Sequence, residues 1–286
     1  WGFNASAFTN SYQNHYNVGC VWRDFAHIAE ARASFTNALA LNPHHVNSLK
    51  NLSELTNLPD EALALLRMAR KVVPDDAELA PIITMWEDLQ RLSPIEIARH
   101  RLVWAEKEIT KRNFRYGKLH LVLARLILLE PQESALSLSL EADICRQNND
   151  LQGSVSLLEQ AVELAPTMPS YWNNLGARRL LLEDRSQLQP AAQACHKAIE
   201  LGNYARPHQN LALIYLRLGE LEKAGEHATK SLDLVKQQIV VAAQEGLVCE
   251  GCPTGGKSQT ECLQCLEKSK STARDVQLAR GDYTIN

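Results

Sequence analysis

Apolar and small residues recur along the chain in a pattern that predicts paired α-helices. Within residues 166–201, Leu175 and Gly176 follow a large apolar residue three positions earlier. Residues three or four positions apart share one face of a helix, so small residues at that spacing let a second helix approach closely. The small residues that follow are Ala191, Cys195 and Ala198. The pattern therefore predicts two helices packed against each other.

The same pattern occurs at several places, with a period of about 34 residues. Pro43 ends its first occurrence, because proline cannot continue a helix. The residues that carry it there are Val18-Gly19, Trp22, Ala31, Phe35 and Ala38. In the last occurrence they are Leu211-Ala212, Tyr215, Ala224, Ala228 and Ser231.

On these residues the chain resembles the tetratricopeptide repeat superfamily, whose unit is a helix–turn–helix of about 34 residues. The resemblance implies an all-α fold, a right-handed superhelical solenoid of antiparallel helix pairs with about five to six repeats. It also implies a scaffold that holds an extended segment of a partner protein in a concave groove.

Three segments follow from the pattern. Residues 1–11 are a polar lead-in, residues 12–235 form the solenoid, and residues 236–286 form a capping helix and a cysteine-containing tail. Large residues of the repeats should lie between helices, where they fill the gaps beside small residues. These are Trp22, Phe35, Trp172, Leu175, Leu211 and Tyr215.

The solenoid is expected to be irregular at about residues 75–131. Two full repeats need about 68 residues, and this stretch is shorter. The apolar positions predict helices at about 77–91, 94–111 and 114–130. The last two both resemble the second helix of a repeat, which indicates a degenerate repeat or a missing helix.

Composition, charge and the absence of certain motifs argue against several classes of function. The 286 residues carry a net charge of −3 with both signs mixed along the chain, which argues against a nucleic-acid partner. No run of 18 apolar residues occurs, so no membrane span is expected. No nucleophile elbow, phosphate loop or HExxH motif is present, so we do not expect an enzyme. The chain begins at Trp1 without Met, which suggests a fragment or a processed product.

An asparagine precedes the Leu-Gly position in each of the four clear repeats, and the resemblance implies that it contacts the backbone of a bound peptide. A carboxamide both donates and accepts hydrogen bonds, so it matches a peptide unit. The alternative is that each asparagine bonds to a neighbouring helix. The four are Asn17, Asn51, Asn174 and Asn210.

In this family, a cluster of basic residues in the groove can bind a C-terminal carboxylate. Lys50, Arg206 and Arg217 are the candidates here, but they do not form the full set. Together with the four asparagines, they make up the predicted partner-binding residues.

The tail contains two CxxC pairs separated by nine residues, formed by Cys249, Cys252, Cys262 and Cys265. One interpretation is a structural zinc site with four thiolate ligands, which fits a cytoplasmic protein. Another is a helical hairpin with the disulfides Cys249–Cys265 and Cys252–Cys262, which fits a periplasmic or extracellular protein. Free thiols are the third. In each case the role is structural.

Three other cysteines, Cys20, Cys145 and Cys195, are expected to pack inward as small apolar residues. The leading function is thus a protein-interaction scaffold with a protein or peptide partner. Alternatives are a structural subunit of a larger complex, or the soluble module of a membrane-anchored glycosyltransferase or secretion protein. A thiol oxidoreductase using the tail is the enzyme alternative.

Overall fold

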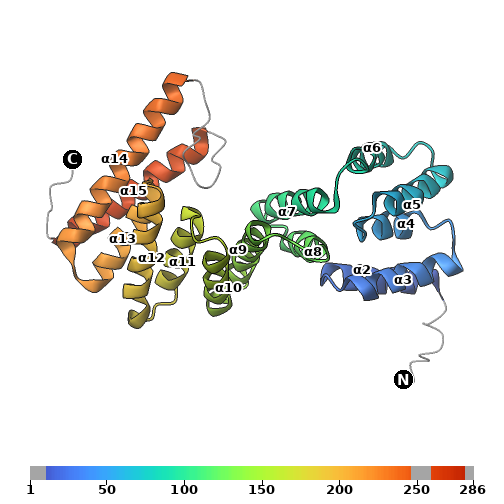
Figure 1. Cartoon of the computed structure of the whole chain (residues 1–286), viewed down its shortest axis with the longest axis horizontal. Coiled ribbons are helices and arrows are strands. Elements are labelled where there is room, and N and C mark those ends of the chain that lie inside the picture. The colour runs from blue at the N-terminus through green and yellow to red at the C-terminus, as the bar shows by residue number, and fades with distance from the viewer. Residues whose placement is uncertain (1–10, 246–258, 281–286) are drawn as a thin grey trace. The chain divides into compact units, whose positions relative to one another are not determined.

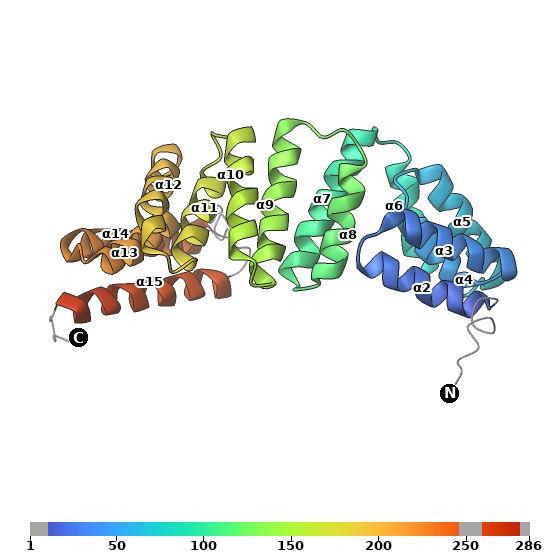
Figure 2. The same ribbon diagram turned by 90° about the horizontal axis from the view of Figure 1, so that it is seen from below.

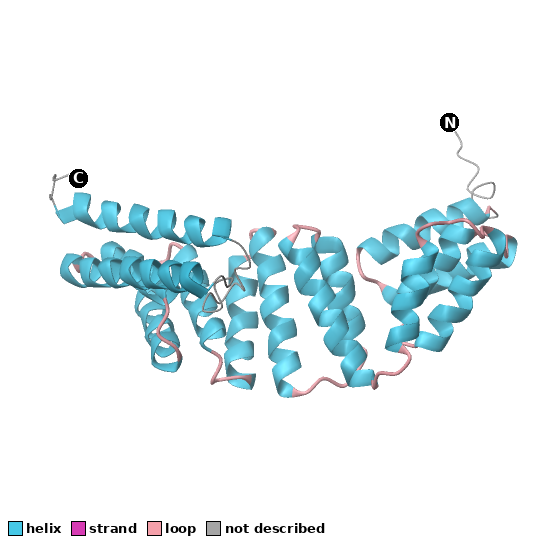
Figure 3. Ribbon diagram, turned by 90° about the horizontal axis from the view of Figure 1, so that it is seen from above, coloured by secondary structure: helices cyan, strands magenta, loops and turns pink. Residues whose placement is uncertain are grey.

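The computed structural model describes the backbone of residues 11–245 and 259–280, with side chains for 11–237 and 266–279. All regular structure in these ranges is helical, and short loops join the helices (Figure 3). The expected all-α architecture of antiparallel helix pairs is confirmed. The chain divides into two compact units, residues 1–144 and residues 145–286.

The described residues of the first unit form three helix hairpins, one single helix and most of a further helix that continues past residue 144 (Figure 1). The hairpins pair α2 with α3, α4 with α5, and α7 with α8, while α6 packs on α5. The bounds are α2 (Tyr12–Asp24), α3 (Ile28–Leu41), α4 (Val46–Glu54), α5 (Pro59–Val72), α6 (Leu79–Leu89), α7 (Pro94–Thr110), α8 (Phe114–Arg125) and α9 (Pro131–Gln147), which runs on into the second unit.

The stretch at 75–131 holds the three predicted helices as α6, α7 and α8, although α8 ends at Arg125. In this stretch, α8 packs against α7 and also against α2, which is distant in sequence. Leu119 and Leu123 are buried together with Phe35, Leu52 and Leu55. In a regular solenoid each repeat contacts only the adjacent repeats, so the α7–α8 hairpin is folded back onto the beginning of the unit.

The second unit is a stack of hairpins covered by a long final helix. Its elements are α10 (Leu151–Leu164), α11 (Pro169–Leu181), a 3-10 turn η1 (Arg185–Gln187), α12 (Leu188–Leu201), α13 (Ala205–Leu218), α14 (Leu221–Glu245) and α15 (Gln259–Arg280). As expected, α14 continues past residue 235. The helix α15 lies along α13 and α14 (Figure 2), with Val276 buried in their core.

The packing predictions succeed for four of the six large residues. Phe35, Leu175 and Leu211 are almost fully buried, and Tyr215 is 8% exposed. The prediction for Trp22 is wrong, because 37% of it is exposed and its ring lies edge-on against the His27 ring at 5.3 Å. The face of α2 that meets α3 is instead the one carrying Gly19.

Trp172 is only half-buried. Its indole N–H donates a 2.8 Å hydrogen bond to the carbonyl of Pro166, in the loop that precedes its own helix. The ring therefore covers a turn and does not fill a gap between two helices.

Gly176 marks a close approach of α11 and α12. A Cβ atom there would collide with the Cys195 sulfur and lie 2.9 Å from the Ala191 carbonyl oxygen, which belongs to the backbone and cannot swing away. Burial raises the pKa of the Cys195 thiol to about 12, so it packs as a small neutral group. The Leu-Gly position of the repeat thus has a steric cause.

The substitution Gly176→Ala should lower the free energy of unfolding by about 1–3 kcal/mol, and Gly176→Leu by more, because the contact leaves no room for added atoms. Urea unfolding curves measure the effect. Gly202→Ala is the matched control, since a Cβ there meets Pro169 only at 3.5 Å. If Gly176→Ala unfolds with the parent protein, the steric explanation fails.

Three histidines from three helices meet in the second unit. His208 on α13 and His227 on α14 share a 2.8 Å contact between their Nδ1 atoms, and the Nε2 of His208 lies 2.8 Å from the Asn203 side-chain oxygen. His227 stacks on Tyr215, with ring centroids 5.6 Å apart. His196 on α12 bonds the Tyr215 hydroxyl at 2.9 Å through Nε2.

The neutral form of this cluster is favoured. Burial lowers the pKa of His208 to about 4, and the neighbouring His227, Lys230 and His196 act in the same direction. Burial also lowers the pKa of His227, with His196 adding to the effect and Glu226 opposing it. Protonation of either ring would place a positive charge in a partly desolvated site beside other basic groups.

Lowering the pH should therefore destabilise the second unit. Folded His208 has a pKa of about 4 against an ordinary value of 6.5, so the unfolded chain binds more protons between these values. Stability is fully present above about pH 6.5 and is lost as the pH falls, by at most about 3 kcal/mol for this residue. Unfolding curves between about pH 7 and about pH 5 measure the slope.

The variant His208→Gln should reduce this pH dependence. His44→Gln is the control, because His44 is exposed in the first unit. An unchanged slope in His208→Gln would assign the pH dependence to other groups.

Candidate partner-binding surface

The first unit contains a pocket of about 360 Å³, lined by α4, α5, α6, α7 and α8. Two of the predicted partner-binding residues, Lys50 and Asn51, line it. Much of the wall is apolar, from Leu66, Ile82, Met85, Trp86 and Trp104. The remaining lining residues are Ser53, Glu54, Arg101, Lys107, Glu108 and His120.

Arg101 on α7 fixes one side of this pocket. It is only 1% exposed, and its Nη2 donates to the carbonyls of Glu54 at 3.0 Å and Thr56 at 2.5 Å. Its Nε donates to the Asn57 side-chain oxygen at 3.2 Å, and its Nη1 lies 3.2 Å from His120 Nδ1. The guanidinium therefore joins α7 to the turn between α4 and α5 and to α8.

Two indole rings enclose the same guanidinium. The Arg101 Cζ lies 5.4 Å from the Trp86 ring centroid and 5.3 Å from that of Trp104, within the range of cation–π attraction. Burial lowers the pKa of Arg101 to about 10, which still leaves it charged at neutral pH. The pKa of His120 falls to about 3, first through burial and then through Arg101, so His120 is neutral and accepts the bond at Nδ1.

Glu54 differs from the other charged groups of the lining. Within the described residues, no hydrogen bond or ion pair reaches its carboxylate, although the site is half-buried. Burial raises the pKa of the Glu54 carboxyl, while the charges of Arg23 and Arg101 act in the opposite direction. The carboxylate thus has compensating charges nearby but lacks hydrogen-bond donors.

The other charges around the pocket are paired or solvated. Lys50 forms ion pairs with Glu78 at 2.5 Å and Asp76 at 3.4 Å, and the bond to Glu78 raises its pKa. Glu108 pairs with Lys111 at 3.0 Å, which lowers its pKa. Lys107 is exposed at the edge. Among the acidic residues of the lining, Glu54 is therefore the one whose carboxylate has no hydrogen-bond donor within the described residues.

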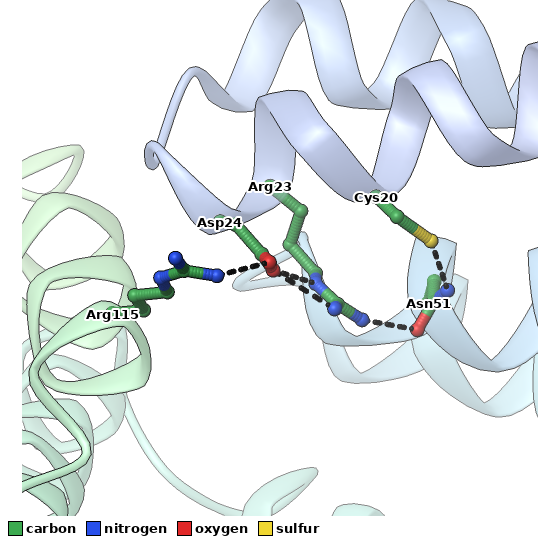
Figure 4. Close-up of polar contacts among 5 residues, drawn as sticks. All are labelled: Cys20, Arg23, Asp24, Asn51 and Arg115. Atoms are coloured by element: carbon green, nitrogen blue, oxygen red, sulfur yellow. Dashed lines mark hydrogen bonds and ion pairs between the residues drawn. The ribbon is translucent and has the colours of Figure 1, made fainter.

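The Asn51 side chain is already engaged (Figure 4). Its oxygen accepts a 2.8 Å bond from Arg23 Nη1, and its Nδ2 lies 3.8 Å from the Cys20 sulfur. Arg23 is held in turn by Asp24 at 3.0 Å, and Asp24 also pairs with Arg115 at 3.2 Å. Asn51 therefore helps to shape the surface, with both polar atoms in use.

The remaining asparagines take different surroundings. Asn17 is exposed and accepts a 3.3 Å bond from the Gln13 side chain one turn earlier. In the second unit, Asn210 Nδ2 donates at 3.0 Å to the buried Asn173, whose own amide lies 3.5 Å from Asn174. Asn210 and Asn174 are half-buried. The side chain of Asn210 is therefore engaged by a contact between α11 and α13, as in the alternative interpretation of the asparagines.

The other predicted positions are spread over the second unit. Arg217 on α13 donates a 2.7 Å bond to the Leu180 carbonyl at the end of α11, so it ties two helices together. Arg206, in the first turn of α13, is half-buried and also has interaction partners.

The four tail cysteines cannot be placed as a cluster. Cys249 and Cys252 lie outside the described residues, and Cys262 and Cys265 lie in α15 without described side chains. The zinc or disulfide site stays a prediction. Of the other cysteines, Cys195 is buried as expected, while Cys20 and Cys145 are half-buried; their side chains are also outside any disulfide.

Sequence reasoning missed the residues that build the pocket, namely Glu54, Trp86, Arg101, Trp104 and His120. The usable signal was Arg101, which lies between Ala98, Leu102 and Ala105 on the inward-facing side of α7. A charged residue on an apolar helix face needs buried partners.

In the described part of the chain, no helix combines the length and apolar character needed to cross a membrane.

Comparison with known proteins locates one repeat directly and detects relatives. The sequence profile described as "Tetratricopeptide repeat" matches residues 205–235. The TPR repeat-containing thioredoxin TTL4 of Arabidopsis thaliana is 39% identical over 75 residues, which cover 26% of this chain and 11% of that protein. The inactive TPR repeat-containing thioredoxin TTL3 of Arabidopsis thaliana is 35% identical over 92 residues, covering 30% and 13%. The chain matches only a small part of these relatives.

Among solved structures, the chain is similar to one chain of the APC/C hetero-tetramer Cut9-Hcn1, with a TM-score of 0.43 and 15% identity. The alignment covers 91% of this chain and 43% of that chain. The repeated small-residue pattern, the helix hairpins and the matched profile agree: the chain contains a tetratricopeptide repeat at residues 205–235 and resembles the tetratricopeptide repeat superfamily, whose members serve as protein-interaction modules.

Proposed function

We propose that the first unit binds an extended segment of a partner protein on the surface around its pocket. The observation that carries this proposal is the pocket itself, which includes Lys50 and Asn51 from the predicted set. A concave, mainly apolar site with a few polar groups is the usual form of a binding site. Its volume of about 360 Å³ is at the small end of such sites and suits one or two side chains.

Hydrogen bonds from Arg101 also hold the walls of the pocket in place. Arg101 holds the turn between α4 and α5 against α7 and α8, so the walls of the pocket are fixed before a partner arrives. A preformed site spares the partner the cost of ordering it. The entropic cost of ordering would then fall on the partner segment and not on the pocket.

The test is to select random linear peptides on the whole protein and to measure their affinity for variants. Met85→Trp should weaken the selected peptides by about tenfold or more, because the larger side chain occupies the pocket. Met68→Trp is the matched control, since Met68 is exposed on α5 and lies outside the pocket lining. Isothermal titration gives both affinities.

Two results would contradict the proposal. Peptides that bind Met85→Trp as tightly as the parent protein would place the binding surface elsewhere. A protein that selects no peptide would favour the alternative of a structural subunit in a larger assembly.

A further inference from the structure

We propose that the pocket of the first unit recognises a lysine side chain of the bound segment, with its ammonium group on the Glu54 carboxylate and its aliphatic stem against Met85 and the two tryptophans. This inference rests on the proposed function, because it specifies which side chain of the partner the same surface would bind.

The carboxylate without a hydrogen-bond donor is that of Glu54. The carboxylate is half-buried and receives no hydrogen bond within the described residues, although a carboxylate can accept about four. A partly desolvated carboxylate without donors is unfavourable, and a ligand that brings N–H groups removes that cost. The pocket therefore favours a ligand that ends in a hydrogen-bond donor.

The nearby cations cannot supply those donors. Arg101 directs its N–H groups at the backbone of the α4–α5 turn, at Asn57 and at His120. Arg23 is committed to Asp24 and Asn51. Both favour the charged form of Glu54 without bonding to it, so the carboxylate still lacks donors at short range.

The walls select the rest of the ligand. Leu66, Ile82, Met85, Trp86 and Trp104 contribute most of the apolar lining. A lysine side chain has four methylene groups before its charge, and such stems pack along apolar surface while the charged end stays polar. The Trp86 and Trp104 rings already hold the Arg101 guanidinium, which leaves less aromatic face for a partner arginine to stack on.

A single carboxylate can bind either a lysine ammonium or, through two parallel bonds, an arginine guanidinium. The choice between them therefore depends on the walls of the pocket and on the acceptors that surround the carboxylate. The other acidic group of the lining, Glu108, is already bonded to Lys111 and Asn113. One acidic acceptor group is thus available, and the indole faces already occupied by Arg101 favour lysine over arginine as the side chain that reaches it.

The experiment compares blocked amino acids on the whole protein, observed through the indole N–H signals of Trp86 and Trp104 in NMR titrations. The probes are Nα-acetyl-lysine methylamide and its norleucine counterpart, which keeps the stem and lacks the ammonium. Lysine should bind about 10- to 100-fold tighter than norleucine, the range expected for hydrogen bonds to a charged group. The signals are assigned with Trp86→Phe and Trp104→Phe.

Glu54→Gln should remove this preference and leave norleucine binding unchanged. Glu106→Gln is the matched control, because Glu106 is an exposed acid on α7 outside the pocket lining. The Glu54 side chain bonds to no described residue, so Glu54→Gln should fold as the parent does, and thermal unfolding checks this. If it does not fold, Glu54→Asp, which withdraws the charge from the ligand, should weaken lysine binding selectively.

Three results would overturn the inference. They are equal binding of lysine and norleucine, tighter binding of the corresponding glutamate probe, and a lysine preference that survives in Glu54→Gln. Each of these leaves the proposed function intact if selected peptides still lose affinity for Met85→Trp. Conversely, selected peptides that bind Met85→Trp as tightly as the parent protein refute the proposed function, whether or not the lysine probe binds.

Discussion

The first unit depends on one buried cation, the guanidinium of Arg101. A buried guanidinium is tolerated only when its donors are satisfied, because removing it from water costs several kcal/mol. The carbonyls of Glu54 and Thr56, the Asn57 side chain and His120 meet that demand, and two indole rings add to it. Since these groups come from the α4–α5 turn, α6, α7 and α8, the requirements of one side chain fix several elements at once.

The pocket is a consequence of this arrangement. Four helices converge on the guanidinium, and the bond from Arg101 to the Glu54 carbonyl holds the end of α4 beside α7. The Glu54 side chain is thereby kept in a half-dry place that its own chemistry does not favour. Natural proteins accept such local conflicts mainly at functional sites. The conflict at Glu54 is the physical basis for regarding the pocket as a recognition site.

The repeats could be predicted from the sequence because their cause is local. Gly176 stands against Cys195, so the spacing of small residues along the chain records a contact between successive helices. Trp22 shows the limit, since a large apolar residue at the expected position lies on the outside when the hairpin turns another face inward. The pocket could not be predicted, because Arg101 bonds residues more than forty positions earlier, and no periodicity encodes that distance.

The asparagines show why a repeat position does not fix a role. Asn51 and Asn210 occupy the same place in their repeats, yet one bonds Arg23 and the other bonds Asn173. A carboxamide can read a peptide backbone only with polar atoms that its own protein leaves available. Because both atoms of Asn51 are engaged, backbone recognition in the first unit would have to displace an existing bond. Binding a partner's side chain in the adjacent pocket requires no such exchange. This favours Glu54 over Asn51 as the residue that determines specificity there.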